Sequence, residues 1–180
     1  DPRLWGGGLS SKAIRYTSGL TLDRNAHVMA RVRSGTTWSA LVEANINIIR
    51  TFRELMISEI MYNPPGVGEI DGDEFEFIEF KNVDSQELEL SGIRFTNGVE
   101  YVFPNGTRLA PGAFFVLVQN PTHFASKYPG VRVEGVFTNN LANSGEALAV
   151  IHAAGAPIQQ FAYDDAVAWP QSADGGGFSL

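Results

Sequence analysis

Short apolar runs of strand length, each closed by a turn, recur along most of this chain and constrain its fold more than any other feature. Residues 113–118 form a continuous apolar run, which is typical of a strand buried on both faces. Asn97-Gly98 separates two further runs and predicts a hairpin with a type I′ turn. Helical character is confined to residues 121–128, with Thr122 as the expected N-cap. Many short strands with regular turns predict an all-β sandwich or barrel.

Composition and charge narrow the classes of function. Hydrophobic residues make up 44% of the 180 residues and charged residues 18%, which is the balance of a folded globular chain. The formal net charge of −7 repels phosphate backbones and anionic lipids, so we expect neither nucleic-acid binding nor membrane insertion. The absence of cysteine excludes disulfides, thiolate catalysis and cysteine-ligated zinc.

The chain divides into two regions of unequal length. Residues 1–49 hold only about three predicted strands, too few for a stable sandwich of their own. We interpret residues 50–54 as a short linker and residues 55–180 as a complete β-sandwich. Because the sequence opens on Asp1-Pro2-Arg3 without a methionine, we expect it to be a piece of a longer protein.

Several separated segments of the second region share one family resemblance. They agree in order and spacing, and comprise residues 57–64, 75–82, 88–93, 101–112, 141–146 and 169–170. On these segments, residues 55–180 resemble the lamin-tail domain, an immunoglobulin-like β-sandwich of nuclear lamins and of many exported bacterial proteins. The bacterial branch fits better. The resemblance implies an immunoglobulin-like fold without hydrolase activity, and similar domains usually continue beyond the equivalent of Leu180.

The first region carries a second resemblance. Ala13-Ile14-Arg15-Tyr16, Val28-Met29-Ala30-Arg31-Val32 and Gly35-Thr36-Thr37-Trp38 resemble the back half of a fibronectin type III-like module of the chitobiase C-terminal sort. Such modules occur in large bacterial surface or secreted proteins. The resemblance therefore implies export, either into the medium or to the cell surface.

The chain contains residue types that occur in catalytic and metal-binding sites, but their spacing does not indicate an enzyme. His27, His123 and His152 are isolated, with no metal-binding histidine spacing and no Gly-x-Ser-x-Gly elbow for a nucleophilic serine. Glu59, Glu76 and Glu79 have the residue type of a glycosidase carboxylate pair. We favour the alternative, a solvated or hydrogen-bonded strand face, and we expect no catalytic residues.

One acidic loop is a candidate metal site. Glu69, Asp71 and Asp73 supply the hard oxygen ligands that Ca²⁺ prefers, although they lack the full EF-hand spacing. Asp164, Asp165 and Asp174 form a second acidic group. The favoured alternative in both places is a solvated acidic loop, and no other cofactor is expected.

Two classes of function remain open from the sequence. The first is a non-catalytic interaction or assembly module of a larger exported protein, binding a protein or a surface polymer. The second is a carbohydrate-binding accessory domain of a secreted hydrolase, in which Trp5, Trp38 and Trp169 would stack on sugars. Exposed, coplanar aromatic rings would favour the second class, and buried tryptophans would count against it.

Overall fold

The computed structural model describes residues 1–22, 26–46 and 52–180. It forms two compact units, Asp1–Arg50 and Thr51–Leu180. The expected linker at residues 50–54 lies partly outside the described residues, and Phe52 already belongs to the core of the second unit.

The first unit consists of paired strands without a core. Strands β1 (Ala26–Ala30) and β4 (Val42–Ile46) pair antiparallel, and β2 (Arg33–Ser34) and β3 (Thr37–Trp38) form a small hairpin. The apolar positions Leu41, Ala44, Ile46 and Ile48 predict a strand over residues 38–48; β4 corresponds to it, and residues 47 and 48 lie outside the described residues. Not one residue of ranges 1–22 and 26–46 is buried. A fibronectin type III-like module here stays a prediction.

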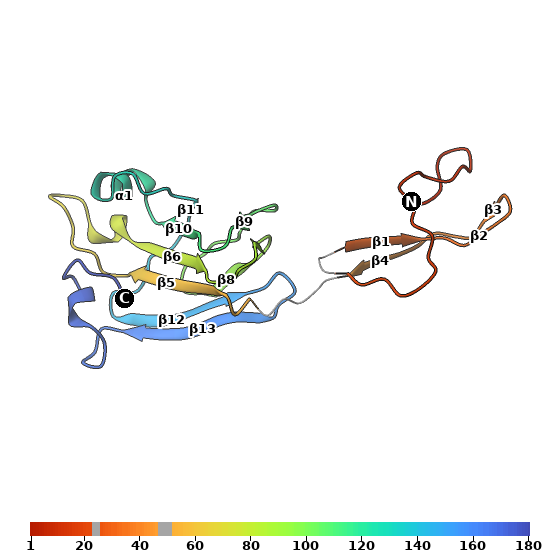
Figure 1. The fold of residues 1–180 in the computed structure, drawn as a ribbon. Coiled ribbons are helices and arrows are strands. Elements are labelled where there is room, and N and C mark those ends of the chain that lie inside the picture. Colours follow the sequence, from red (N-terminus) through yellow and green to blue (C-terminus); the bar gives the residue numbers. More distant parts are fainter. Residues whose placement is uncertain (23–25, 47–51) are drawn as a thin grey trace. The chain divides into compact units, whose positions relative to one another are not determined.

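The second unit is a β-sandwich of two sheets (Figure 1). One sheet has the strand order β11-β10-β6-β5, and its strands are β5 (Leu55–Met61), β6 (Phe77–Asn82), β10 (Phe114–Val118) and β11 (Gly135–Val136). The other has the order β13-β12-β8, with β8 (Arg94–Asn97), β12 (Gly145–Ile151) and β13 (Pro157–Asp164). All these pairs are antiparallel except β10 with β11. The all-β, immunoglobulin-like sandwich predicted for residues 55–180 is confirmed.

Shorter elements complete this unit. Strands β7 (Leu88–Glu89) and β9 (Arg108–Leu109) form a small antiparallel pair. The helical elements are η1 (Gly72–Phe75), α1 (Pro121–Lys127) and η2 (Gln171–Ala173). Among the described residues, no helix is long and apolar enough to cross a membrane.

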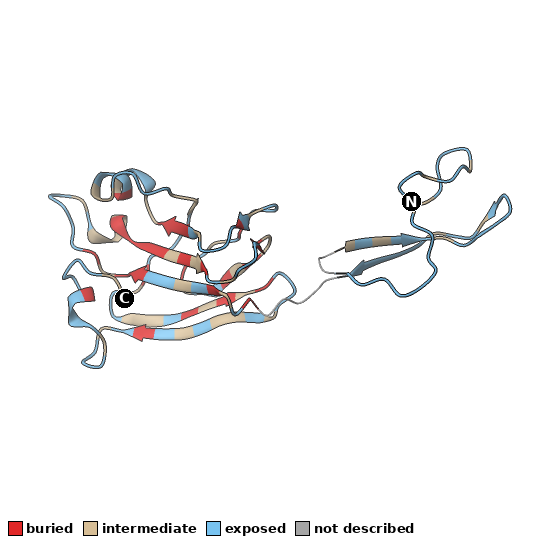
Figure 2. Ribbon diagram, viewed as in Figure 1, coloured by how far each residue is buried: buried red, intermediate tan, exposed pale blue. Residues whose placement is uncertain are grey.

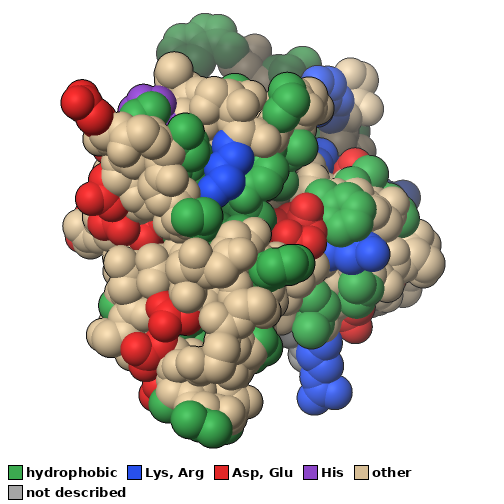
Figure 3. Space-filling view, turned by 90° about the vertical axis from the view of Figure 1, so that its left-hand side faces the viewer, with side chains coloured by type: hydrophobic (Ala, Val, Ile, Leu, Met, Phe, Trp, Pro, Cys, Tyr) green, Lys and Arg blue, Asp and Glu red, His purple; other side chains and the backbone are tan. Residues whose placement is uncertain are grey.

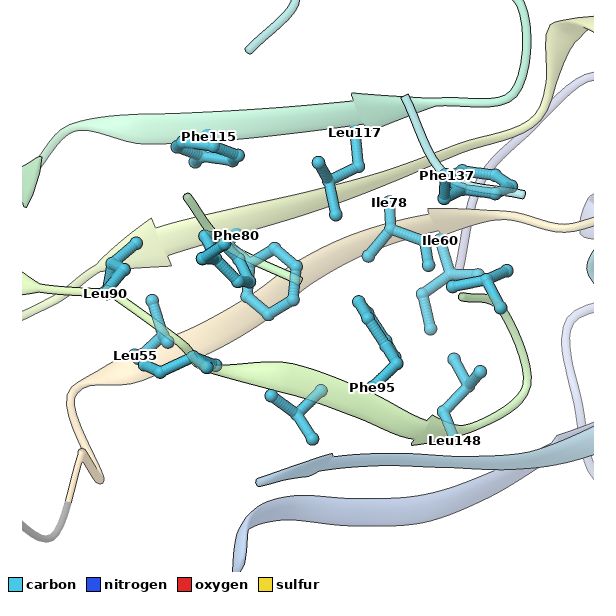
Figure 4. Close-up of a cluster of buried hydrophobic side chains, with 14 of the residues drawn as sticks. Leu55, Ile60, Ile78, Phe80, Leu90, Phe95, Phe115, Leu117, Phe137 and Leu148 are labelled. Carbon is cyan, nitrogen blue, oxygen red and sulfur yellow. The ribbon is translucent and has the colours of Figure 1, made fainter. Parts of the chain in front are cut away.

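The main core lies between the two sheets, where large apolar side chains from both layers meet (Figures 2 and 4). Phe80, Phe95, Phe103 and Phe115 form a series of tilted and edge-to-face ring contacts, with centroids 5.0 to 5.9 Å apart. Aromatic pairs in these geometries contribute about 0.5–1.5 kcal/mol beyond their area burial. This packing fixes the positions of the strands in both sheets.

The four-stranded sheet is buried on its outer face as well. There α1 covers a second apolar cluster of Met61, Phe77, Val116, Val118 and Phe124. Neighbouring residues such as Phe77 and Ile78 therefore enter different clusters. In the sequence the apolar residues Phe75, Phe77, Ile78 and Phe80 break strict alternation between Phe77 and Ile78, which predicts either a bulge or burial on both faces. Burial on both faces accounts for this break in β6, and the bulge lies instead in the partner strand β5, between Ile57 and Glu59.

Two local predictions from the sequence were wrong. The N-cap of α1 is Asn120, whose side chain accepts from the backbone N–H groups of Thr122 and His123. Pro121 takes the first helical position, where its missing N–H costs nothing, so the helix begins before Thr122. The hairpin predicted around Asn97-Gly98 is present, because residues 101–103 return along β8. Its turn is not of type I′, since that type requires a positive φ at both central residues and only Gly98, not Asn97, has one.

Candidate interaction site

The outer edge of β10 is the first candidate site. The N–H of Val116 donates to Glu134 Oε2 at 2.9 Å, and the N–H of Glu134 donates to the carbonyl of Val116 at 3.0 Å. Alternation along the strand turns the backbone groups of Phe114 toward this same edge. The pairing with β11 covers only Leu117 and Val118. Phe114 therefore presents a backbone donor and acceptor that no described residue of an adjoining strand satisfies.

A groove of about 480 Å³ runs along this open end of β10. Its apolar lining includes Phe114, Phe115 and Val133, and Arg108 and Arg132 belong to its polar lining. The side chain of Phe114 is 47% exposed. An open strand edge beside an apolar groove is the arrangement that accepts an extended peptide by strand addition.

Basic side chains gather at this groove although the unit is strongly acidic. Thr51–Leu180 holds six Lys or Arg and seventeen Asp or Glu, a formal charge of −11, whereas Asp1–Arg50 has a formal charge of +4. Lys81 Nζ lies 4.7 Å from the ring centroid of Phe114. Arg108 pairs with Glu87 at 2.8 Å, and Arg132 pairs with Glu134 at 3.2 Å. Both arginines are therefore partly neutralised, and the groove is close to neutral.

The calcium candidates lie around η1. Asp71 is the N-cap of η1 and accepts from the N–H of Asp73 at 3.2 Å. Asp73 Oδ2 accepts from Asn140 Nδ2 at 2.6 Å, and Glu69 is exposed. Within residues 1–22, 26–46 and 52–180, no three His, Cys, Asp or Glu side chains converge in a way that could hold a metal ion. Calcium binding at Glu69, Asp71 and Asp73 stays a prediction.

The second acidic group lies at the end of β13 and beyond it. Asp174 Oδ1 accepts from Asn63 Nδ2 at 2.6 Å, and Asp164 Oδ1 accepts from the N–H of Ala166 at 2.8 Å. Figure 3 views the end of the sandwich that carries α1 and shows acidic side chains scattered over it. These carboxylates satisfy nearby loop amides, which is a structural role.

A buried carboxyl group lies near this end. Glu76 is fully buried, and its Oε2 accepts from the N–H of Leu141 at 2.9 Å. Its Oε1 has no hydrogen-bond partner in the described part of the chain. Burial, together with the nearby Asp73 and Glu146, raises the pKa of Glu76 to about 8. The Glu76 side chain is thus protonated at neutral pH.

The tyrosine pair beside Glu76 ties the two sheets together. Tyr62 and Tyr163 pack with ring centroids 4.8 Å apart. The hydroxyl of Tyr163 donates to the carbonyl of Ala142, and it lies 3.1 Å from Glu146 Oε1. Burial and the neighbouring Glu146 raise the pKa of Tyr163, so it stays a neutral hydrogen-bond donor.

The three glutamates weighed as glycosidase carboxylates do not converge on one site. Glu59 and Glu79 lie opposite each other on β5 and β6 and accept hydrogen bonds from Ser179 and Ser58, whereas Glu76 is buried. The histidines are also separate: His123 meets Glu74 at 3.1 Å, and His27 meets Glu43 at 3.0 Å. These contacts are ordinary side-chain pairs, which need no catalytic explanation.

The tryptophans do not share one environment. Trp5 is fully exposed. The indole of Trp38 donates to the carbonyl of Gly7 at 2.8 Å, and the guanidinium of Arg33 lies 5.3 Å from its ring centroid. Trp169 is partly buried against the main core. Trp38 and Trp169 are thus engaged in packing, which weakens the main sequence argument for sugar binding.

The model of the lamin tail domain family matches residues 50–165. The chain belongs to the lamin tail domain family. A comparison with curated proteins finds no match. Lamin tail domains are immunoglobulin-like, generally serve protein interactions and are not typically catalytic. The groove of this lamin tail domain was not predicted from its sequence, because an apolar run such as residues 113–118 does not show which backbone groups stay unpaired.

Proposed function

We propose that this lamin tail domain is a non-catalytic interaction module of a larger exported bacterial protein and binds an extended peptide segment of a partner protein. The observation that carries the proposal is the unpaired backbone of Phe114 beside the groove. Family membership supports an interaction role, and the acidic composition makes nucleic acid a poor partner.

The groove suits a short strand better than a folded surface. An added strand would pair with Phe114, place alternate side chains against Phe115 and Val133, and reach Arg108 or Arg132 at the rim. Glu134 already occupies the N–H of Val116. The peptide is therefore limited to the stretch before Val116 unless it displaces that carboxylate.

Peptide selection followed by a backbone variant tests the proposal. Peptides selected from a random display library on the full chain should shift the amide resonance of Phe114 on binding. Phe114→Pro removes an outward N–H but no ladder bond, which edge strands tolerate, and it should abolish binding. Phe114→Leu keeps the N–H and should retain most of the affinity.

Two outcomes separate this function from others. Peptides that bind equally well to Phe114→Pro would place the site elsewhere and contradict the proposal. Export is tested on the parent protein, which should be accessible to added protease on intact bacteria or be present in the medium. An intracellular, protease-protected parent protein would contradict that part.

A further inference from the structure

Two of the four sheet edges in the second unit are closed by groups from elsewhere in the chain, and a third is partly closed. On β8, the N–H of Phe95 donates to Tyr101, and the N–H of Phe103 donates to Ile93. On β5, Ile60 and Leu180 exchange backbone hydrogen bonds of 2.9 and 3.1 Å. The third edge is partly closed, because β11 pairs with Leu117 and Val118 and Glu134 accepts from the N–H of Val116, which leaves only Phe114 open.

The fourth edge, along β13, is open over its whole length. Pro157–Asp164 is the longest strand of the protein's described part, and it pairs only with β12. Apart from β12, no described residue hydrogen-bonds to its backbone. Exposed edges of this kind are templates for another strand, and proteins usually protect them with charges, prolines or bulges.

The β12–β13 hairpin lacks charged protection. Residues 147–163 contain no Asp, Glu, Lys or Arg, although the unit carries 23 such residues in all. Pro157 and a bulge at Ile158 protect only the beginning of β13, and Asp164 only its last position, so the regular edge comprises residues 159–163. Two copies that approach through this edge therefore avoid the repulsion that acidic residues elsewhere on the unit would cause.

Two copies of β13 can pair about a two-fold axis without bringing charged residues opposite each other. Gln159, Phe161 and Tyr163 face the core, because they pair with Val150, Leu148 and Glu146 of β12, of which Leu148 and Val150 are buried. A dyad perpendicular to the sheet must pair positions that face the same side. Centring it on Gln160 places Gln159 opposite Phe161 of the second copy, two positions on the core side of the sheet, and it leaves Asp164 opposite an uncharged residue.

We propose that β13 pairs antiparallel with β13 of a second copy, so that two three-stranded sheets become one six-stranded sheet with Gln160 opposite Gln160 of the second copy. The interface uses one self-complementary edge, as a closed dimer requires. It is separate from the groove beside β10, so it stands whether or not that groove binds peptides.

Sedimentation equilibrium of the full chain tests the proposal directly. The weight-average mass should rise toward twice the monomer mass between about 1 μM and about 1 mM protein. Raising the ionic strength from about 0.05 M to about 0.5 M should strengthen the dimer, because salt screens the repulsion between two acidic units. An interface built on ion pairs would weaken instead.

One substitution and a matched control locate the interface. Gln160→Lys places two like charges directly opposite each other and should weaken the dimer at least about tenfold, a change of about 1.4 kcal/mol. Gln86→Lys makes the same change of charge at an exposed loop glutamine and should leave the dimer unchanged. Hydrogen exchange of the β13 amides should slow as protein concentration rises.

Three results would overturn the proposal. The first is a chain that stays monomeric throughout this concentration range. The second is a Gln160→Lys dimer as tight as that of the unaltered chain, and the third is hydrogen exchange in β13 that does not depend on protein concentration. A dimer that persists in Gln160→Lys would instead assign association to another surface, such as the exposed apolar side chains of the first unit.

Discussion

The side-chain amide of Gln159 bonds to the backbone of Leu55 as a neighbouring strand would. Gln159 Nε2 donates to the carbonyl of Leu55 at 2.9 Å, and Gln159 Oε1 accepts from the N–H of Ile57 at 3.4 Å. A residue of one sheet thereby closes part of the edge of the other. These two hydrogen bonds join β13 to β5 and protect this part of the β5 edge from strand addition.

Replacing Gln159 by leucine should therefore destabilise the second unit. The change keeps the side-chain volume but leaves two backbone groups without a protein partner, and we expect a loss of about 1–2 kcal/mol in the free energy of unfolding. Gln160→Leu, at the exposed neighbouring position, should cost less than about 0.5 kcal/mol. Equal losses in urea denaturation would show that the Gln159 amide does not protect the edge.

The buried carboxyl of Glu76 predicts how stability depends on pH. Its pKa is about 8 in the folded chain, against an ordinary value of 4.5. Between these values the folded chain holds a proton that the unfolded chain releases, so the free energy of unfolding falls as pH rises. The slope from this group approaches about 1.4 kcal/mol per pH unit at most, and it flattens above pH 8.

A neutral amide in place of Glu76 tests the origin of that slope. Glu76→Gln should flatten the fall in stability between pH 5 and 8, as measured by thermal or urea unfolding, because glutamine has no proton to lose. Glu69→Gln removes an exposed carboxylate near η1 and should leave the slope unchanged. A slope that survives Glu76→Gln would assign the pH dependence to other groups.

Gly145 predicts a stability cost that combines strain and crowding. Its φ is +92°, and a Cβ there would lie 2.6 Å from both Asp164 Cα and the Tyr163 carbonyl oxygen. We expect Gly145→Ala to cost more than about 2 kcal/mol. Gly155 has a similar φ of +89° but open space around its Cβ position, so Gly155→Ala should cost only about 1–2 kcal/mol. Similar losses for both would rule out the clash.

Calcium binding at the acidic loop is tested by thermal unfolding with Ca²⁺, with EDTA as the control. Because Asp71 and Asp73 already accept hydrogen bonds from Asp73 and Asn140, we expect about 10 mM Ca²⁺ to leave the midpoint unchanged. A rise that Asp71→Asn removes, and that Asp164→Asn leaves intact, would instead place an ion on Glu69, Asp71 and Asp73.

The second unit should fold without the first. Every buried residue in the described part of the chain belongs to Thr51–Leu180, so the apolar burial that drives folding is located there. A chain of residues 51–180 should unfold cooperatively with a midpoint within a few degrees of that of the full chain. A large loss of stability would show that residues 1–50 contribute to the core.

Patterns of side-chain type determined most of the fold. The apolar run at residues 113–118 predicts a doubly buried strand, and Phe115 and Leu117 do enter one cluster while Val116 and Val118 enter the other. Alternation and turns act over neighbouring residues, so they are visible in sequence. The helix at residues 121–128 was predicted in the same way, although its cap was not.

Only the tertiary structure decided which surfaces are candidates for function. The pKa of Glu76 depends on burial and on Asp73 and Glu146, while the opening at Phe114 depends on where β11 ends. The sequence shows that residues 147–163 lack charge, but it does not show that β13 is an unpaired edge. Desolvation and strand pairing are set by residues distant in sequence, and therefore by how the two sheets pack.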